Sequence, residues 1–141
     1  MIKKSLLGLF LLITTLCCFS SCEEDPYLDP YDPYEVAMEN LCTPIWYDQY
    51  ITDKNLDCLQ ELEFNYDHTG YDHRTYYYPN GATRTEDIPF DWDWDKGYTD
   101  ALYIDYMDGD GVWLEDIVFG RNTMTCIYDG LDEPVVFKAR Y

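Results

Sequence analysis

The sequence predicts an all-β fold, an antiparallel up-and-down meander of seven to eight strands closed into a barrel or rolled into a curled sheet, with a short N-terminal helix. Three observations support this. Apolar and polar residues alternate in several short segments, as in half-buried strands. Turn residues separate these segments. No segment between them is long enough to form the crossover helix that parallel strands need.

The predicted helix begins at Asp32-Pro33-Tyr34-Glu35. An acidic N-cap, proline at the first helical position and glutamate at the third are typical helix-start chemistry. Tyr34, Met38 and Leu41 fall on one helical face, so we expect the helix to reach about Leu41.

The strands follow in order, each with its own pattern. Strict alternation marks Glu61 to Tyr66, and the same period recurs at Leu102, Ile104 and Tyr106. The segment from Val112 to Phe119 is apolar on both sides apart from two acids, which predicts a strand that is either more buried or bulged. Further strands are predicted around Tyr76-Tyr77-Tyr78, Phe90 to Trp94, Met124 to Tyr128, and Val135 to Tyr141.

Turns are predicted where glycine and asparagine cluster, because these residues tolerate the positive φ angles of tight hairpins. The turn segments are Asp67-His68-Thr69-Gly70, Asn80-Gly81, Asp108-Gly109-Asp110-Gly111, Gly120-Arg121-Asn122 and Asp129-Gly130. Closure into a barrel would remove the exposed edges of such a meander.

The N-terminus has the pattern of an export signal. Lys3 and Lys4 precede an apolar stretch from Leu6 to Phe19, which is shorter than the ~20 residues of a membrane-spanning helix. Phe19-Ser20-Ser21-Cys22 resembles the lipobox of bacterial lipoproteins. That resemblance implies a signal peptide over residues 1–21 and lipidation of Cys22. The alternative is a plain secreted protein in which Cys22 forms a disulfide.

Residues 22–31 read as an acidic tether, and residues 32–141 as a single β domain. Glu23-Glu24-Asp25 resembles the signal that sends Bacteroidetes lipoproteins to the outer face of the outer membrane. The expected location is therefore the outer membrane, lipid-anchored and surface-exposed, with the periplasmic face as the alternative.

The strongly negative net charge of the chain limits the kinds of partner it can bind. The chain has 28 acidic residues against 9 lysines and arginines, for a net charge of −19. Loss of residues 1–21 would remove two lysines and no acid, giving −21. Such a surface repels phosphate backbones, so we expect no nucleic-acid partner. An aromatic content of 18% argues against disorder despite this charge.

Three cysteines remain beyond Cys22. Cys42 and Cys58 could form a disulfide, which would close a loop of ~15 residues and contribute ~3 kcal/mol. The alternative is that Cys42, Cys58 and Cys126 are buried thiols that pack as small hydrophobes.

Several landmarks together resemble the small lipocalin-like lipoproteins of Bacteroidetes. They are Trp46 on a first strand after a short helix, the strand and turn from Phe64 to Gly70, the aromatic strand from Phe90 to Trp94, Leu102 to Tyr106, and Trp113. The resemblance covers about Leu41 to Tyr141. It implies a lipocalin-like barrel and a cell-envelope address, but no particular activity.

Candidate metal ligands are few. Asp91, Asp93 and Asp95 alternate with Trp92 and Trp94, so one strand face could present three carboxylates to a hard cation. The calcium-loop pattern is incomplete, and a solvated outer face with both tryptophans inward is the plainer interpretation. His68 and His73 flank a turn without a second ligand cluster. We therefore predict no metal and no cofactor.

The fifteen tyrosines favour binding at a surface, because rigid aromatics with a polar tip are common in recognition sites. Tyr76, Tyr78, Trp92 and Trp94 are the candidate aromatic binding face. The alternative is that aromatics of this kind fill the core.

The predicted function is a lipid-anchored binding or interaction module without catalytic activity, for a small ligand, a glycan or a partner protein. One alternative is a structural or accessory subunit of an outer-membrane surface complex. The other is a hydrolase with paired carboxylates, but a chain so rich in acids offers such pairs by chance.

Overall fold

The computed structural model describes residues 32–141. One helix, α2 (Pro33–Cys42), is followed by eight strands. The strands are β1 (Ile45–Ile51), β2 (Asp57–Phe64), β3 (Thr69–Tyr77), β4 (Thr83–Trp94), β5 (Leu102–Tyr106), β6 (Gly111–Phe119), β7 (Thr123–Tyr128) and β8 (Val135–Arg140). The predicted short helix is confirmed, and it ends one residue beyond Leu41.

The strands form a closed antiparallel barrel in which each strand pairs with its neighbour in sequence. β1 closes the ring against β8, with Trp46 opposite Ala139. The predicted up-and-down meander is therefore confirmed, and the structure is the barrel rather than the open curled sheet. Closure pairs Ile45–Tyr47 of β1 with Lys138–Arg140 of β8, which shortens the exposed edges that would otherwise recruit other chains.

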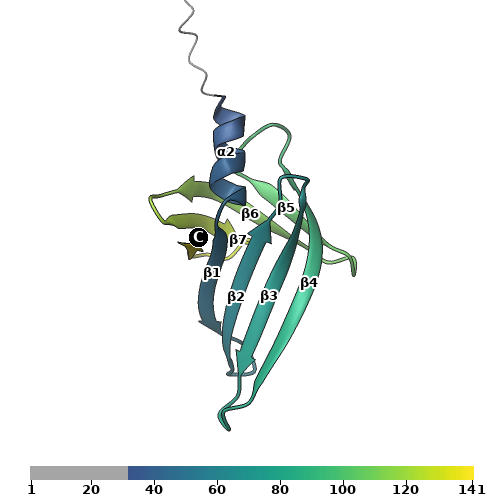
Figure 1. Cartoon of the computed structure of the whole chain (residues 1–141), viewed down its shortest axis with the longest axis vertical. Coiled ribbons are helices and arrows are strands. Elements are labelled where there is room, and N and C mark those ends of the chain that lie inside the picture. The colour runs from purple at the N-terminus through teal and green to yellow at the C-terminus, as the bar shows by residue number, and fades with distance from the viewer. Residues whose placement is uncertain (1–31) are drawn as a thin grey trace, which may run out of the picture. The chain divides into compact units, whose positions relative to one another are not determined.

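Helix α2 packs over one end of this barrel (Figure 1). Its buried residues Ala37, Met38 and Leu41 join the same hydrophobic cluster as the strand residues beneath it. Trp46 fixes the junction, because its Nε1 donates a hydrogen bond to the Leu41 carbonyl at 2.9 Å. Met38 and Leu41 of the predicted apolar face thus cover the core, whereas Tyr34 is 42% exposed and Ala37 is buried instead.

A bulge in β6 explains the mixed pattern between Val112 and Phe119. The register with β7 shifts between Glu115 and Val118. Asp116 takes a positive φ of 52°, so both Leu114 and Ile117 can be buried although three positions separate them. Of the two alternatives predicted for this segment, a bulged strand or a more buried one, the structure confirms the bulge.

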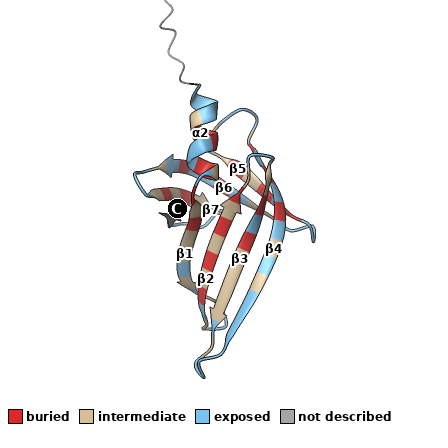
Figure 2. Ribbon diagram, viewed as in Figure 1, coloured by how far each residue is buried: buried red, intermediate tan, exposed pale blue. Residues whose placement is uncertain are grey.

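Burial is uneven along the barrel (Figure 2). Fully buried apolar residues such as Phe64, Leu102 and Met124 lie in the half next to α2. The opposite end, where loops 52–56, 78–82, 107–110 and 129–134 lie, has mostly half-buried and exposed residues. We call this the open end. Among the described residues, no helix is both long and apolar enough to span a bilayer.

Candidate functional site: a polar cup at the open end of the barrel

The inward faces of β1 to β4 become polar toward the open end. Asp48, Gln60, Arg74 and Glu86 are successive cross-strand neighbours in one row. Tyr50, Cys58, Tyr76 and Arg84 form the next row outward. Because side chains alternate along a strand, these residues share the face that carries Trp46, Leu62 and Phe90 deeper in the barrel. The interior therefore changes from apolar to polar along the same strands.

These residues surround a cavity that we call the cup, which consists of two adjoining lobes. The polar lobe has a volume of about 400 Å³, and the apolar lobe has a volume of about 380 Å³. Tyr50 and Arg74 line both lobes. The polar lobe is otherwise lined by Thr52, Asp53, Lys54, Leu56, Tyr76, Tyr78, Arg84 and Glu86. The apolar lobe is otherwise lined by Asp48, Gln60, Tyr128, Leu131, Val135 and Phe137.

Asp72 lies at the base of the cup and is fully buried. Its Oδ2 accepts hydrogen bonds from Arg74 Nη2 at 2.7 Å, Tyr106 Oη at 2.7 Å and Gln60 Nε2 at 2.9 Å. Arg74 Nε adds contacts of 3.1 and 3.2 Å to the two carboxylate oxygens. A buried carboxylate is tolerated when its oxygens are bonded in this way. This network separates the cup from the hydrophobic core.

The electrostatics of the base keep its phenols neutral and its arginine charged. Burial, together with the charge of Asp72, raises the pKa of Tyr106. Burial also raises the pKa of Tyr128. Burial alone would lower the pKa of Arg74, but its hydrogen bonds and charge interaction with Asp72 outweigh that effect, so the pKa is raised. The base of the cup therefore offers hydrogen-bond donors and a neutralised ion pair.

A second ion pair lies nearer the mouth. Arg84 Nη2 contacts Glu86 Oε1, and Tyr76 Oη donates to Glu86 Oε2 at 3.3 Å. Tyr78 lines the same lobe. Two of the four residues predicted as an aromatic binding face, Tyr76 and Tyr78, thus lie together at the cup.

The other two, Trp92 and Trp94, do not belong to such a face, and that part of the prediction is wrong. They are 3% and 6% exposed and lie in the core. Trp92 Nε1 donates to the Thr69 carbonyl at 3.1 Å, and Trp94 Nε1 contacts Met38 Sδ at 3.3 Å. The inward phase of β4, which is shared with Phe90, places both indoles in the hydrophobic core, where burial of their large apolar area stabilises the barrel. The plainer interpretation of this strand is the one the structure shows.

Cys42 and Cys58 are free thiols, as is Cys126, so the proposed disulfide is not formed. Cys42 precedes β1, whose first residue lies opposite Glu63, whereas Cys58 lies opposite Tyr50 near the other end of that strand. Five strand residues separate the two levels, about 16 Å at ~3.3 Å per residue, which is beyond disulfide reach. Burial raises the pKa of the Cys42 thiol to about 11 and that of the Cys126 thiol to about 12.

The candidate metal ligands are dispersed. Asp91 and Asp93 are exposed on the outer face of β4, and within residues 32–141 no group of three or more histidine, cysteine or acidic side chains could hold a metal ion. His68 stacks on Trp92 with ring centres 4.6 Å apart. His73 Nδ1 lies 2.6 Å from Asp87 Oδ1. Both histidines therefore make local contacts on the barrel surface.

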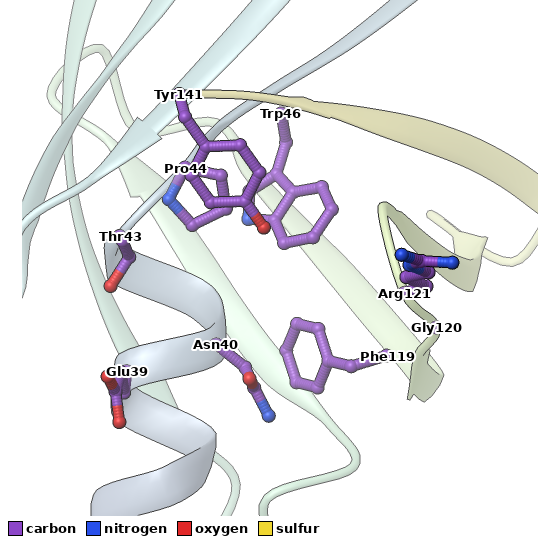
Figure 3. Close-up of a pocket in the computed structure, with 9 residues that line it drawn as sticks. All are labelled: Glu39, Asn40, Thr43, Pro44, Trp46, Phe119, Gly120, Arg121 and Tyr141. Carbon is purple, nitrogen blue, oxygen red and sulfur yellow. The ribbon is translucent and has the colours of Figure 1, made fainter.

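A smaller hollow of about 200 Å³ lies at the α2 end (Figure 3). Figure 3 shows Phe119 and Trp46 facing it, with Asn40 on the helix side. Trp46 is buried and already bonded to Leu41, so its indole is committed to the core. The cup is larger and combines the buried Asp72–Arg74 ion pair with the more exposed Arg84–Glu86 pair and several phenols. We therefore regard it as the candidate site.

The predicted lipidation site at Cys22, the signal peptide over 1–21 and the tether over 22–31 lie outside the described residues. The most informative cup residues, Asp48, Gln60, Asp72, Arg74 and Tyr128, were not singled out from the sequence. A signal for three of them was present. Because Leu62 and Phe64 point inward, the alternation of β2 places Gln60 inward, and an inward Tyr76 implies the same for Arg74 and Asp72 on β3.

Fold and site together define a small closed up-and-down barrel with a polar cup at one end, an architecture suited to holding a ligand in its mouth. Comparison with known proteins finds no matching family model, no similar curated protein and no similar solved structure.

Proposed function

We propose that this protein is a lipid-anchored binding module of the cell envelope that holds a small ligand in the cup, without transforming it. The observation that carries the proposal is the cup itself. A barrel of this size could fill its whole interior with side chains, yet half of it leaves two adjoining lobes of about 400 and 380 Å³. These volumes are in the range of pockets that hold small molecules.

The composition of the cup supports binding over a purely structural role. One lobe is walled by apolar side chains, while the other places phenols and ion pairs around its mouth. Apolar walls with a few convergent polar groups are typical of ligand sites. The anchor and the envelope address rest on the lipobox-like segment ending at Cys22 and on the acidic residues after it. The resemblance to lipocalin-like lipoproteins remains part of this proposal.

A pair of neighbouring valines offers a matched test. Val135 lines the apolar lobe, whereas Val136 is 46% exposed on the outside of the same strand. In the full-length lipoprotein solubilised from envelopes, mass spectrometry of the extracted small molecules should detect a bound compound other than detergent. Val135→Trp should reduce its amount at least about tenfold because the indole fills the lobe. Val136→Trp should leave it unchanged.

Two results would contradict the proposal. One is a wild-type protein that carries no compound beyond what an unrelated lipoprotein carries. The other is equal occupancy in the two tryptophan variants. Val135→Phe, which adds less volume, serves as the second variant if the tryptophan at position 135 lowers the yield of folded protein.

A further inference from the structure

We infer that the ligand of the cup is an organic ammonium ion, a protonated amine with a compact apolar body, and that Asp48 is its counter-ion. This inference rests on the proposed function and names the chemical class that the same site would take. It is carried by the position of Asp48, the state of Arg74, the lining of the apolar lobe and the charge of the whole chain.

Asp48 presents a carboxylate to the apolar lobe. It shares the inward phase of β1 with Trp46 and Tyr50, is half-buried, and lines the lobe beside Phe137 and Tyr128. Within residues 32–141 its side chain forms no ion pair and no hydrogen bond to another side chain. In the lobe it lies opposite Gln60 on β2, and the other lining residues are aromatic or aliphatic apart from Arg74. A half-buried carboxylate in such a lining is stabilised by a cation that accompanies it. A ligand cation would supply that partner.

The other charged group lining this lobe is Arg74, and its charge is already balanced. Its Nε and Nη2 donate to Asp72, which carries one negative charge against the one positive charge of the guanidinium. Asp48 is therefore the group that sets the net charge of the apolar lobe, and that charge is negative.

The lining suits an ammonium group with an apolar body. Tyr50, Tyr128 and Phe137 offer aromatic faces, which attract cations, while Leu131 and Val135 offer apolar area. The volume of about 380 Å³ accommodates a single substituted ring or a short chain. The apolar body would be held by burial, and its charge by Asp48.

The charge of the whole chain favours the same class. With 28 acids against 9 bases, the protein attracts cations toward its clefts and repels anions. The polar lobe could be considered for an anion, since Lys54 and Arg84 line it. However, Arg84 is paired with Glu86, and Asp53 adjoins Lys54 on the same loop. The positive charges of that lobe are therefore largely balanced locally.

The test uses calorimetry on the full chain carrying Cys22→Ser, so that no acyl group competes for the cup. The probes are 2-phenylethylamine, 2-phenylethanol and 3-phenylpropionate, which share a ring and differ in charge. The amine should bind at least about tenfold more tightly than the alcohol, and the acid should bind most weakly. Asp48→Asn should abolish this preference while keeping the side-chain shape. Asp105→Asn, at an exposed position on β5, removes the same charge and should leave the preference intact.

Equal affinity for the amine and the alcohol, tighter binding of the acid, or binding of none of the three would overturn the inference. The comparison among probes needs only the Cys22→Ser chain, so it stands even if Asp48→Asn impairs folding. Failure here remains separable from failure of the proposed function. A compound that Val135→Trp displaces from the native lipoprotein would still support a ligand-binding cup, with a ligand of another class.

Discussion

The role of a single residue in the cup follows from its hydrogen-bond partners, and Asp72 is the clearest case. Asp72 has no exposed surface, and it joins groups from β2, β3 and β5 through Gln60, Arg74 and Tyr106. The net attraction within a buried ion pair adds little to the free energy of unfolding. Removing one member costs much more, because the other member is then left buried without a partner. A substitution at Asp72 should therefore destabilise the protein mainly because the charge of Arg74 is left without a partner.

Asp72→Asn should lower the free energy of unfolding by about 3 kcal/mol, because it leaves the guanidinium of Arg74 without its counter-charge. Urea denaturation of the full chain would measure the loss. Adding Arg74→Met to Asp72→Asn should recover part of it, since both charges are then absent. Asp91→Asn, on the exposed outer face of β4, should change stability by less than about 0.5 kcal/mol. If Asp72→Asn lowers the free energy of unfolding no more than Asp91→Asn does, the network around Asp72 does not stabilise the base of the cup.

At the scale of elements, β3 and β4 make close contact in the core half of the barrel, next to α2. Gly70 lies opposite both Phe64 and Phe90. A Cβ at Gly70 would lie 2.3 Å from the Glu63 carbonyl oxygen and 2.4 Å from Phe90 Cε2. The absence of a side chain at this position lets the Phe90 ring cross the strand and pack beside Phe64 with ring centres 5.4 Å apart.

Gly70→Ala should therefore destabilise the barrel by about 2–3 kcal/mol through overpacking against backbone and a buried ring. Gly81→Ala is the matched control. Gly81 has a φ of +84° with open space around it, so alanine there should cost only about 1 kcal/mol of backbone strain. Thermal or urea unfolding of the two variants compares them directly. A smaller loss at Gly70 than at Gly81 would show that Phe90 can move aside without penalty.

The whole molecule combines a closed barrel with a strongly acidic surface and a proposed membrane anchor. Closure pairs Ile45–Tyr47 of β1 with β8, so within residues 32–141 only a short stretch of these two edges is left for association. A protein of this kind would then depend on its lipid for attachment, since its negative charge also repels acidic membrane surfaces.

Cys22→Ser should accordingly shift the protein from the membrane pellet to the soluble fraction of disrupted cells. One acyl chain binds a membrane only marginally, and two or three hold it durably, so loss of the acylated cysteine should leave little attachment. Immunoblots of carbonate-washed membranes would measure the distribution. Cys42→Ser is the control and should stay in the pellet. Retention of Cys22→Ser in washed membranes would mean that something other than acyl chains holds the protein there.

Local alternation in the sequence was sufficient to predict the β class and the inward face of several strands, and helix-start chemistry predicted the short helix. The order of the strands around the barrel and its closure came from the tertiary structure. Alternation is informative because burial of one strand face imposes a period of two residues on the chain. The same rule predicts that Asp91 and Asp93 point outward and Trp92 and Trp94 inward, as the structure shows. The same alternation therefore argues against a surface binding face that includes Trp92 and Trp94, because it places both side chains inside the barrel.

Only the tertiary structure decided which side chains meet across the interior. Gln60 on β2, Asp72 and Arg74 on β3, Tyr106 on β5 and Tyr128 on β7 converge because closure and strand stagger bring opposite walls together. Those contacts depend on register and shear, which no single strand encodes. The same geometry separates Cys42, the last residue of α2, from Cys58 near the far end of the β1–β2 hairpin. Alternation in the sequence predicts whether a side chain points into the barrel or out of it. The closed barrel determines which other side chains it contacts there.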